Sequence, residues 1–207
     1  MSSVTLEAPR EAEPTMPLIT TLDDRLGSFG MALLIATEAT LFTMLFAAYF
    51  YTGTGTHRWQ FQTPPRLHYA IPMLVVLLIS SGTLHWGELL VKKGRPGAAR
   101  IALIATILLG IGFVVISYFE YLEEWQLLTP RTDTYGSIFF TIVSLHLAHV
   151  IVGLVMLTWL LLLGSRWEPV KSPPHHPFHN VSMYWHFVDT VWIFVVAILY
   201  VYPNIAH

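Results

Sequence analysis

Histidine and acidic side chains recur at helical spacing within otherwise apolar stretches of this 207-residue chain. His146 and His149 lie three positions apart, as do His186 and Asp189, and residues at this spacing share one face of a helix. Such pairs could ligate a metal or haem, form a path for protons or ions, or hydrogen-bond one helix to another. For these four residues we favour interhelical hydrogen bonds, and a proton path is the main alternative.

Glu38 differs from these pairs because it stands alone among apolar neighbours. The residues three and four positions away are Leu34, Ile35, Leu41 and Phe42. An unpaired carboxylate is disfavoured in such surroundings. We therefore expect Glu38 to be mostly protonated at neutral pH and hydrogen-bonded to a histidine or a hydroxyl on a neighbouring helix. Two roles stay open for it: a structural hydrogen bond, or proton delivery to a partner.

The histidines could also suggest a metal centre. His146 and His149 have a spacing that could bind iron, and His175, His176 and His179 resemble part of a histidine box. Membrane di-iron enzymes bring several such clusters to one membrane face, whereas these two groups are expected in a loop and near mid-bilayer. We therefore predict no metal ligand and no catalytic residue here, and keep a stand-alone His-ligated membrane metalloenzyme as an alternative. The absence of cysteine excludes thiol catalysis, Cys-ligated zinc and iron–sulfur clusters.

The composition places these side chains in a membrane. Hydrophobic residues make up 54% of the chain and charged residues 12%, and the mean hydropathy is +0.57. Soluble domains carry about 25% charged residues, so a soluble fold of this chain would expose far more apolar surface than its core could hide. The net charge of −2 gives no indication of nucleic-acid binding.

Five apolar segments are long enough to cross a bilayer, which takes about 20 residues as a helix. They span residues 28–51, 69–91, 100–121, 135–163 and 181–202. We predict an all-α polytopic membrane protein, a bundle of five transmembrane helices formed by residues 26–207. Residues 1–25 are expected to be a polar cytoplasmic tail, and Glu120, Glu123 and Glu124 a solvated helix end.

The loop charges predict the orientation of the bundle. Eight of the eleven basic residues fall in the N-terminal tail and in the second and fourth connections, namely Arg10, Arg25, Lys92, Lys93, Arg95, Arg100, Arg166 and Lys171. The positive-inside rule then places the N-terminus in the cytoplasm and the C-terminus outside. At headgroup level, the candidate lipid contacts are Lys92, Lys93, Arg95 and Arg166.

Four motifs in order resemble subunit III of the haem–copper respiratory oxidases. They read IATEATLF at 35–42, YFEYLE at 118–123, YGSIFF at 135–140 followed by HLAHVIVG at 146–153, and YWHFVDTVW at 184–192. Glu38 matches the buried glutamate of that family. His146, His149, His186 and Asp189 match its interhelical polar residues, and Arg166 matches a lipid-headgroup arginine.

The resemblance implies a non-catalytic subunit of an aerobic respiratory complex in the bacterial inner (plasma) membrane. The implied partner is a catalytic subunit that holds the haems and copper, reduces dioxygen to water and pumps protons. This chain would carry no cofactor of its own apart from bound phospholipid. It would support assembly, lipid binding and proton uptake.

Two departures from the family pattern limit the inference. Larger members have seven helices, so five helices resemble the short bacterial form. Just before the last segment, this chain also lacks the acidic residue that many cytochrome c oxidase members carry, and has His179 and Asn180 near that place. The electron donor, cytochrome c or quinol, stays open. So does an accessory role in a nitric oxide reductase system, which shares the fold.

Overall fold

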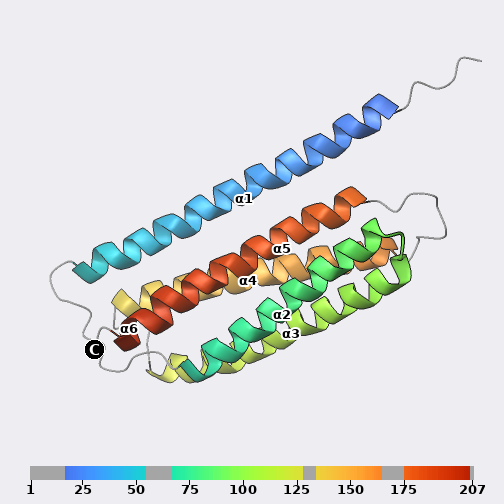
Figure 1. The fold of residues 1–207 in the computed structure, drawn as a ribbon. Helices are drawn as coiled ribbons and strands as arrows, with labels where there is room; N and C mark the ends of the chain where they lie inside the picture. Colours follow the sequence, from blue (N-terminus) through green and yellow to red (C-terminus); the bar gives the residue numbers. More distant parts are fainter. Residues whose placement is uncertain (1–16, 55–66, 128–133, 165–174, 206–207) are drawn as a thin grey trace, which may run out of the picture.

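The structure, a computed structural model, describes residues 17–54, 67–127, 134–164 and 175–205. These residues form a bundle of long helices and contain no strand (Figure 1). The helices are α1 (Pro17–Thr54), α2 (Leu67–Lys92), α3 (Pro96–Leu127), α4 (Thr134–Gly164) and α5 (His175–Val195). A π-helical turn (Val196–Val201) and the short α6 (Tyr202–Ile205) continue α5.

The predicted five-helix membrane bundle is confirmed. Five segments are long and apolar enough to cross a membrane: Leu26–Gly53, Leu67–Lys92, Pro96–Trp125, Thr134–Leu163 and Pro177–Ile205. Each begins one to four residues before the segment expected from hydropathy, and all but the fourth also end later, because helices continue past the hydrocarbon into the polar interface. α1 also begins at Pro17, so residues 17–25 are helical although the sequence places them in the tail.

The connection between α2 and α3 shows how the sequence makes a tight helical hairpin. Gly94 has a φ of 70°, a left-handed conformation that suits glycine. The Gly94 N–H donates to the Val91 carbonyl and the Arg95 N–H to the Leu90 carbonyl, both at 2.9 Å. These two bonds form a Schellman motif, and Pro96 then opens α3 where its missing N–H costs nothing.

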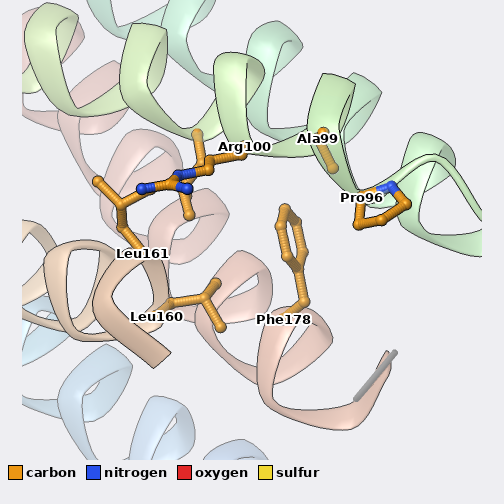
Figure 2. A pocket seen from close by; sticks show the side chains of 8 residues that line it. Pro96, Ala99, Arg100, Leu160, Leu161 and Phe178 are labelled. Atoms are coloured by element: carbon orange, nitrogen blue, oxygen red, sulfur yellow. The ribbon is translucent and has the colours of Figure 1, made fainter. Parts of the chain in front are cut away.

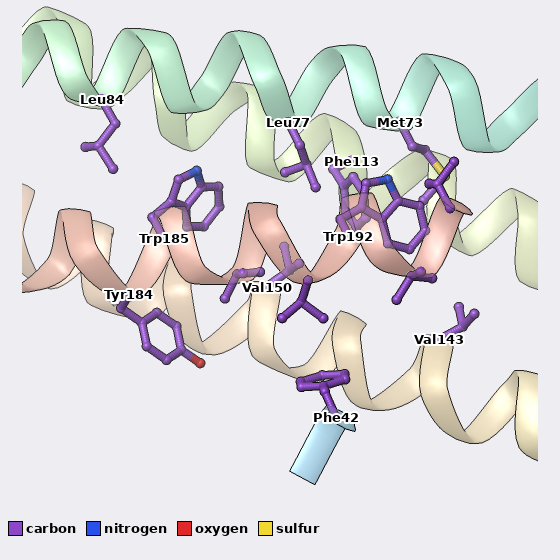
Figure 3. Close-up of a cluster of buried hydrophobic side chains, with 14 of the residues drawn as sticks. Phe42, Met73, Leu77, Leu84, Phe113, Val143, Val150, Tyr184, Trp185 and Trp192 are labelled. Carbon is purple, nitrogen blue, oxygen red and sulfur yellow. The ribbon is translucent and has the colours of Figure 1, made fainter. Parts of the chain in front are cut away.

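α5 lies at the centre of the bundle, between α1 on one side and α2 and α3 on the other (Figure 1). Trp185 and Trp192 are fully buried and lie between the α5 backbone and α2 (Figure 3). Glycines make room for Trp185: a Cβ on Gly110 would lie 2.9 Å from its ring, and a Cβ on Gly153 2.8 Å. The small residues therefore leave room for the Trp185 ring against the backbones of α3 and α4, and small residues are common where membrane helices pack.

α1 is peripheral by comparison. Of its described side chains, residues 26–53, only Phe42 and Tyr49 are buried. Ser28 adds one polar contact near the N-terminal end of the helix by donating to Asn180 Oδ1 at 2.9 Å. The helix is thus attached to the bundle along one narrow line, and most of its surface is left for lipid or for another protein.

Candidate functional site: polar clusters within the bundle

Glu38 of α1 meets His149 of α4, with 3.0 Å between Glu38 Oε2 and His149 Nε2. The expectation of a histidine partner on a neighbouring helix is confirmed. His149 Nδ1 lies 2.7 Å from the Leu145 carbonyl, and a carbonyl only accepts, so Nδ1 carries a proton. The contact with Glu38 then needs one more proton, on the carboxyl or on Nε2. Glu38 and His149 can therefore hold or pass a single proton.

Glu38 is less enclosed than the sequence suggests. Its side chain keeps 31% of its surface exposed and that of His149 keeps 13%. The edge of the His149 ring meets Phe42 with ring centroids 5.1 Å apart, so the pair borders the apolar contact between α1 and α4. The carboxyl thus lies at the rim of this chain, where lipid or a partner could reach it.

His146 has surroundings unlike those of His149, although the two share one helix. Its ring is fully buried and stacks on Trp192 at 4.8 Å, with the edges of Phe42 and Phe113 against it. Neither ring nitrogen has a hydrogen-bond partner among the described residues. The interhelical hydrogen bond favoured for His146 is therefore not formed, because aromatic side chains occupy the positions that a polar partner would need.

His186 and Asp189 of α5 face α2. The Ser81 hydroxyl lies 2.6 Å from His186 Nδ1, which gives His186 an interhelical hydrogen bond of the kind expected. Asp189 is buried, and neither of its carboxyl oxygens has a hydrogen-bond partner within the described part of the chain. Next to them, the Trp185 N–H donates to Ser80 Oγ at 3.1 Å.

A charged cluster at the end of α2 joins Lys92, predicted only as a lipid contact, to two residues that the sequence-based site prediction did not include. The Glu88 carboxyl accepts from Lys92 at 2.8 Å and lies 3.1 Å from His179 Nδ1 of α5. The four-residue spacing of Glu88 and Lys92 is a signal that could have indicated half of this cluster. His179 could not be placed, because sequence spacing does not tell which helices are neighbours.

Two of the three acids at the end of α3 contradict the expectation of a solvated helix end, while the side chain of the third, Glu123, keeps 30% of its surface exposed. Glu120 and Glu124 are buried, and the fully buried Tyr200 of the π-helical turn lies beside Glu120. A π-helical turn holds one more residue than an α-helical turn, which rotates the following side chains around the helix axis. In this bundle the turn places Tyr200 in the core beside Glu120, near the C-terminal end of α3. Hydropathy alone does not indicate this feature.

The basic residues lie at the α2–α3 hairpin, and Lys92, Lys93 and Arg95 are exposed there. Arg166 lies outside the described residues. Nearby, a cavity of about 120 Å³ opens between the start of α3, the end of α4 and the start of α5 (Figure 2). Arg100 reaches across it toward Leu161, with Leu160 and Phe178 on the other side. One guanidinium above apolar walls suits a lipid headgroup with its chain.

No group of three or more His, Asp or Glu side chains within the described segments could hold a metal ion. The Glu38–His149 pair lies between α1 and α4, whereas Glu88, His179, His186 and Asp189 lie between α2 and α5. What they have in common is that they can bind protons.

Comparison with known proteins identifies the family. The sequence model of cytochrome c oxidase subunit III matches residues 20–204, which include all five membrane-spanning helices. Cytochrome c oxidase subunit 3 of Gallus gallus is 34% identical over 181 residues, covering 83% of this chain and 68% of the relative.

The same protein of Loxodonta africana is 33% identical over 180 residues, with 83% of this chain and 68% of the relative covered. The probable cytochrome c oxidase subunit 3 of Mycobacterium leprae is 32% identical over 180 residues, which cover 84% of this chain and 86% of the relative. The stand-alone metalloenzyme and the nitric oxide reductase alternative gain no support from these matches. The chain belongs to the cytochrome c oxidase subunit III family.

Proposed function

We propose that this chain is the non-catalytic subunit III of a proton-pumping haem–copper terminal oxidase in the inner (plasma) membrane of a bacterium. The observation that carries the proposal is the family match over all five spanning helices. The catalytic subunit beside it would hold the haems and copper and transfer electrons to dioxygen. Cytochrome c or quinol would supply those electrons through other subunits.

The proposed contribution of this chain is assembly, lipid binding and support of proton uptake. Following the loop charges, the Lys92 end of the bundle faces the cytoplasm and the C-terminus faces outward. The site residues of the proposal are Glu38, His146, His149, His186 and Asp189. Paired or clustered protonatable groups at two of the helix contacts support a role near proton uptake.

Phospholipid is the proposed occupant of the cavity beside Arg100. A guanidinium binds phosphate through two parallel hydrogen bonds, and the lining residues Leu103, Leu160 and Phe178 suit an acyl chain. The exposed side chains of Lys92, Lys93 and Arg95 lie at the nearby hairpin and would add attraction for anionic headgroups. Arg166 belongs to the same proposal on sequence grounds alone.

Affinity purification tests the assignment. An affinity tag on this chain should co-purify a haem–copper catalytic subunit from mild-detergent extracts, with the haem spectrum lost when that partner is stripped away. Stoichiometric iron or a haem absorption band in the isolated polypeptide would contradict the accessory role.

A further inference from the structure

A seam of polar side chains runs between α2 and α5 from one end of the bundle to its middle. Successive members lie about one helical turn apart on both helices, which run in opposite directions. The seam is made of Ser81, His85, Glu88 and Lys92 on α2 and of His179, Ser182, His186 and Asp189 on α5.

The seam is open at the Lys92 end. The side chains of Lys92 and His179 keep 56% and 50% of their surfaces exposed, and both contact the Glu88 carboxyl, which is 10% exposed. Glu88 can thus exchange a proton with His179 at the surface. From Glu88 the seam passes His85, whose ring lies 6.4 Å from that of His186, a gap that one water molecule can bridge.

The seam ends at a carboxyl group with unused hydrogen-bonding capacity. Ser81 Oγ lies 2.6 Å from His186 Nδ1 and beside the Asp189 carboxyl. Asp189 is 4% exposed, and both of its oxygens lack a hydrogen-bond partner among the described residues. A buried carboxyl group without a partner in the protein is usually hydrogen-bonded to a buried water molecule or carries a proton itself.

Aromatic rings close the seam beyond Asp189. Trp192, one turn further along α5, packs against Phe113 with ring centroids 5.0 Å apart and against His146 at 4.8 Å. Glu120 and Tyr200 lie on the far side of these rings. Ser81 of α2 lies beside the Asp189 carboxyl, and His186 lies one turn before it on α5. The other titratable groups of the seam, His85 and Glu88, lie further toward the Lys92 end, and His146 of α4 stacks on the Trp192 ring.

We propose that Asp189 is a proton-binding site reached only from the Lys92 end of the bundle, through this seam. A proton that arrives at His186 Nε2 releases the Nδ1 proton to Ser81 Oγ, and the Ser81 hydroxyl proton passes to Asp189. One proton leaves the water, Asp189 becomes a neutral acid, and His186 stays neutral with its proton on Nε2. The site belongs to this chain alone and does not require delivery of the proton to a catalytic partner.

Infrared hydrogen–deuterium exchange on the intact purified oxidase tests the proposal. The carbonyl stretch of protonated Asp189, assigned by its loss in Asp189→Asn, should shift soon after transfer to D2O. Ser81→Ala should slow this shift on the order of 10²-fold, the usual cost of losing a proton-transfer group. Ser81→Thr keeps the hydroxyl and should keep the rate. If Ser81→Ala does not assemble, His186→Gln makes the same test.

Glu120 is the matched control, because it is equally buried but lies beyond the aromatic rings. Its band, assigned by Glu120→Gln, should exchange at a rate that Ser81→Ala leaves unchanged. Equal slowing of both bands would mean a general change in the bundle and would overturn the proposal. It is also overturned if Asp189 exchanges at the same rate without the Ser81 hydroxyl, or shows no protonated band at any pH at which the complex stays intact.

Discussion

α1 and α5 are both long membrane-spanning helices, yet they hold to the bundle in opposite ways. Half of the residues in the most apolar stretch of the α5 segment are buried, compared with 6% for α1. Hydropathy cannot separate them, because lipid and protein interior are equally apolar. Close packing separates them: α5 fits Trp185 against two glycines, whereas α1 touches the bundle through a few side chains.

This difference predicts where a substitution acts. Along α5 a change should disturb the fold of the whole subunit, since α1, α2 and α4 pack along it and Phe113 of α3 contacts its Trp192. Along α1 a change should leave the bundle folded and affect its contact with lipid or with a partner. The Glu38–His149 pair lies at α1, where a substitution should leave the bundle folded. The Asp189 seam lies along α5, where a substitution should disturb the fold.

Gly153→Val should have the largest effect. A Cβ at this position would lie 2.8 Å from the Trp185 ring, and overpacking of this kind costs about 1–3 kcal/mol or more. We expect much less assembled subunit in the membrane, measured by quantitative immunoblotting of the purified complex. Gly30→Val on α1 is the control, since nothing lies within 4 Å of its Cβ. Equal loss in the two variants would refute the contrast between α1 and α5.

Glu38→Ala should have a smaller effect, confined to α1. Removal of the carboxyl leaves His149 Nε2 without its partner, and interhelical hydrogen bonds in membranes contribute about 0.6 kcal/mol on average. Glu38→Gln should assemble like the unmodified chain, because its amide N–H can donate to Nε2 while Nδ1 stays bonded to Leu145. Thermal stability of the detergent-solubilised complex measures both variants. A Gln variant as unstable as the Ala variant would show that the pair needs an ionised carboxylate.

Arg100→Gln should have the smallest effect on the fold, because Arg100 is exposed. It should reduce retained phospholipid, since a neutral amide cannot replace a bidentate guanidinium–phosphate contact. Native mass spectrometry of the complex would count the lipids that remain bound. His68→Gln, a change of an exposed side chain at the opposite end of α2, is the control. The same lipid count in the Arg100→Gln and unmodified complexes would rule out this cavity as a lipid site.

The sequence predicts this fold well and its polar contacts only in part. The five apolar segments are a local signal, and the bundle that they predict is confirmed. The turn at Gly94 and Pro96 depends on local chemistry in the same way. The burial of Glu120 and the aromatic surroundings of His146 depend instead on how α3 and α4 are rotated against α5. Rotation is set by side chains distant in sequence, such as Trp185 and Gly110, and the π-helical turn at Val196–Val201 changes it again.

The pH dependence of oxygen reduction by the whole oxidase, with and without this subunit, tests the central claim most directly. An accessory subunit that supports proton uptake should leave oxygen reduction intact at low pH and sustain it at high pH, where protons are scarce. Turnover without the subunit should therefore decrease most steeply at high pH. If the Glu38–His149 pair takes part, the pH profile of the Glu38→Gln oxidase should lie between those of the oxidase with and without the subunit. Superimposable profiles, or complete loss of activity at every pH in a catalytic subunit that retains its haems, would contradict the account.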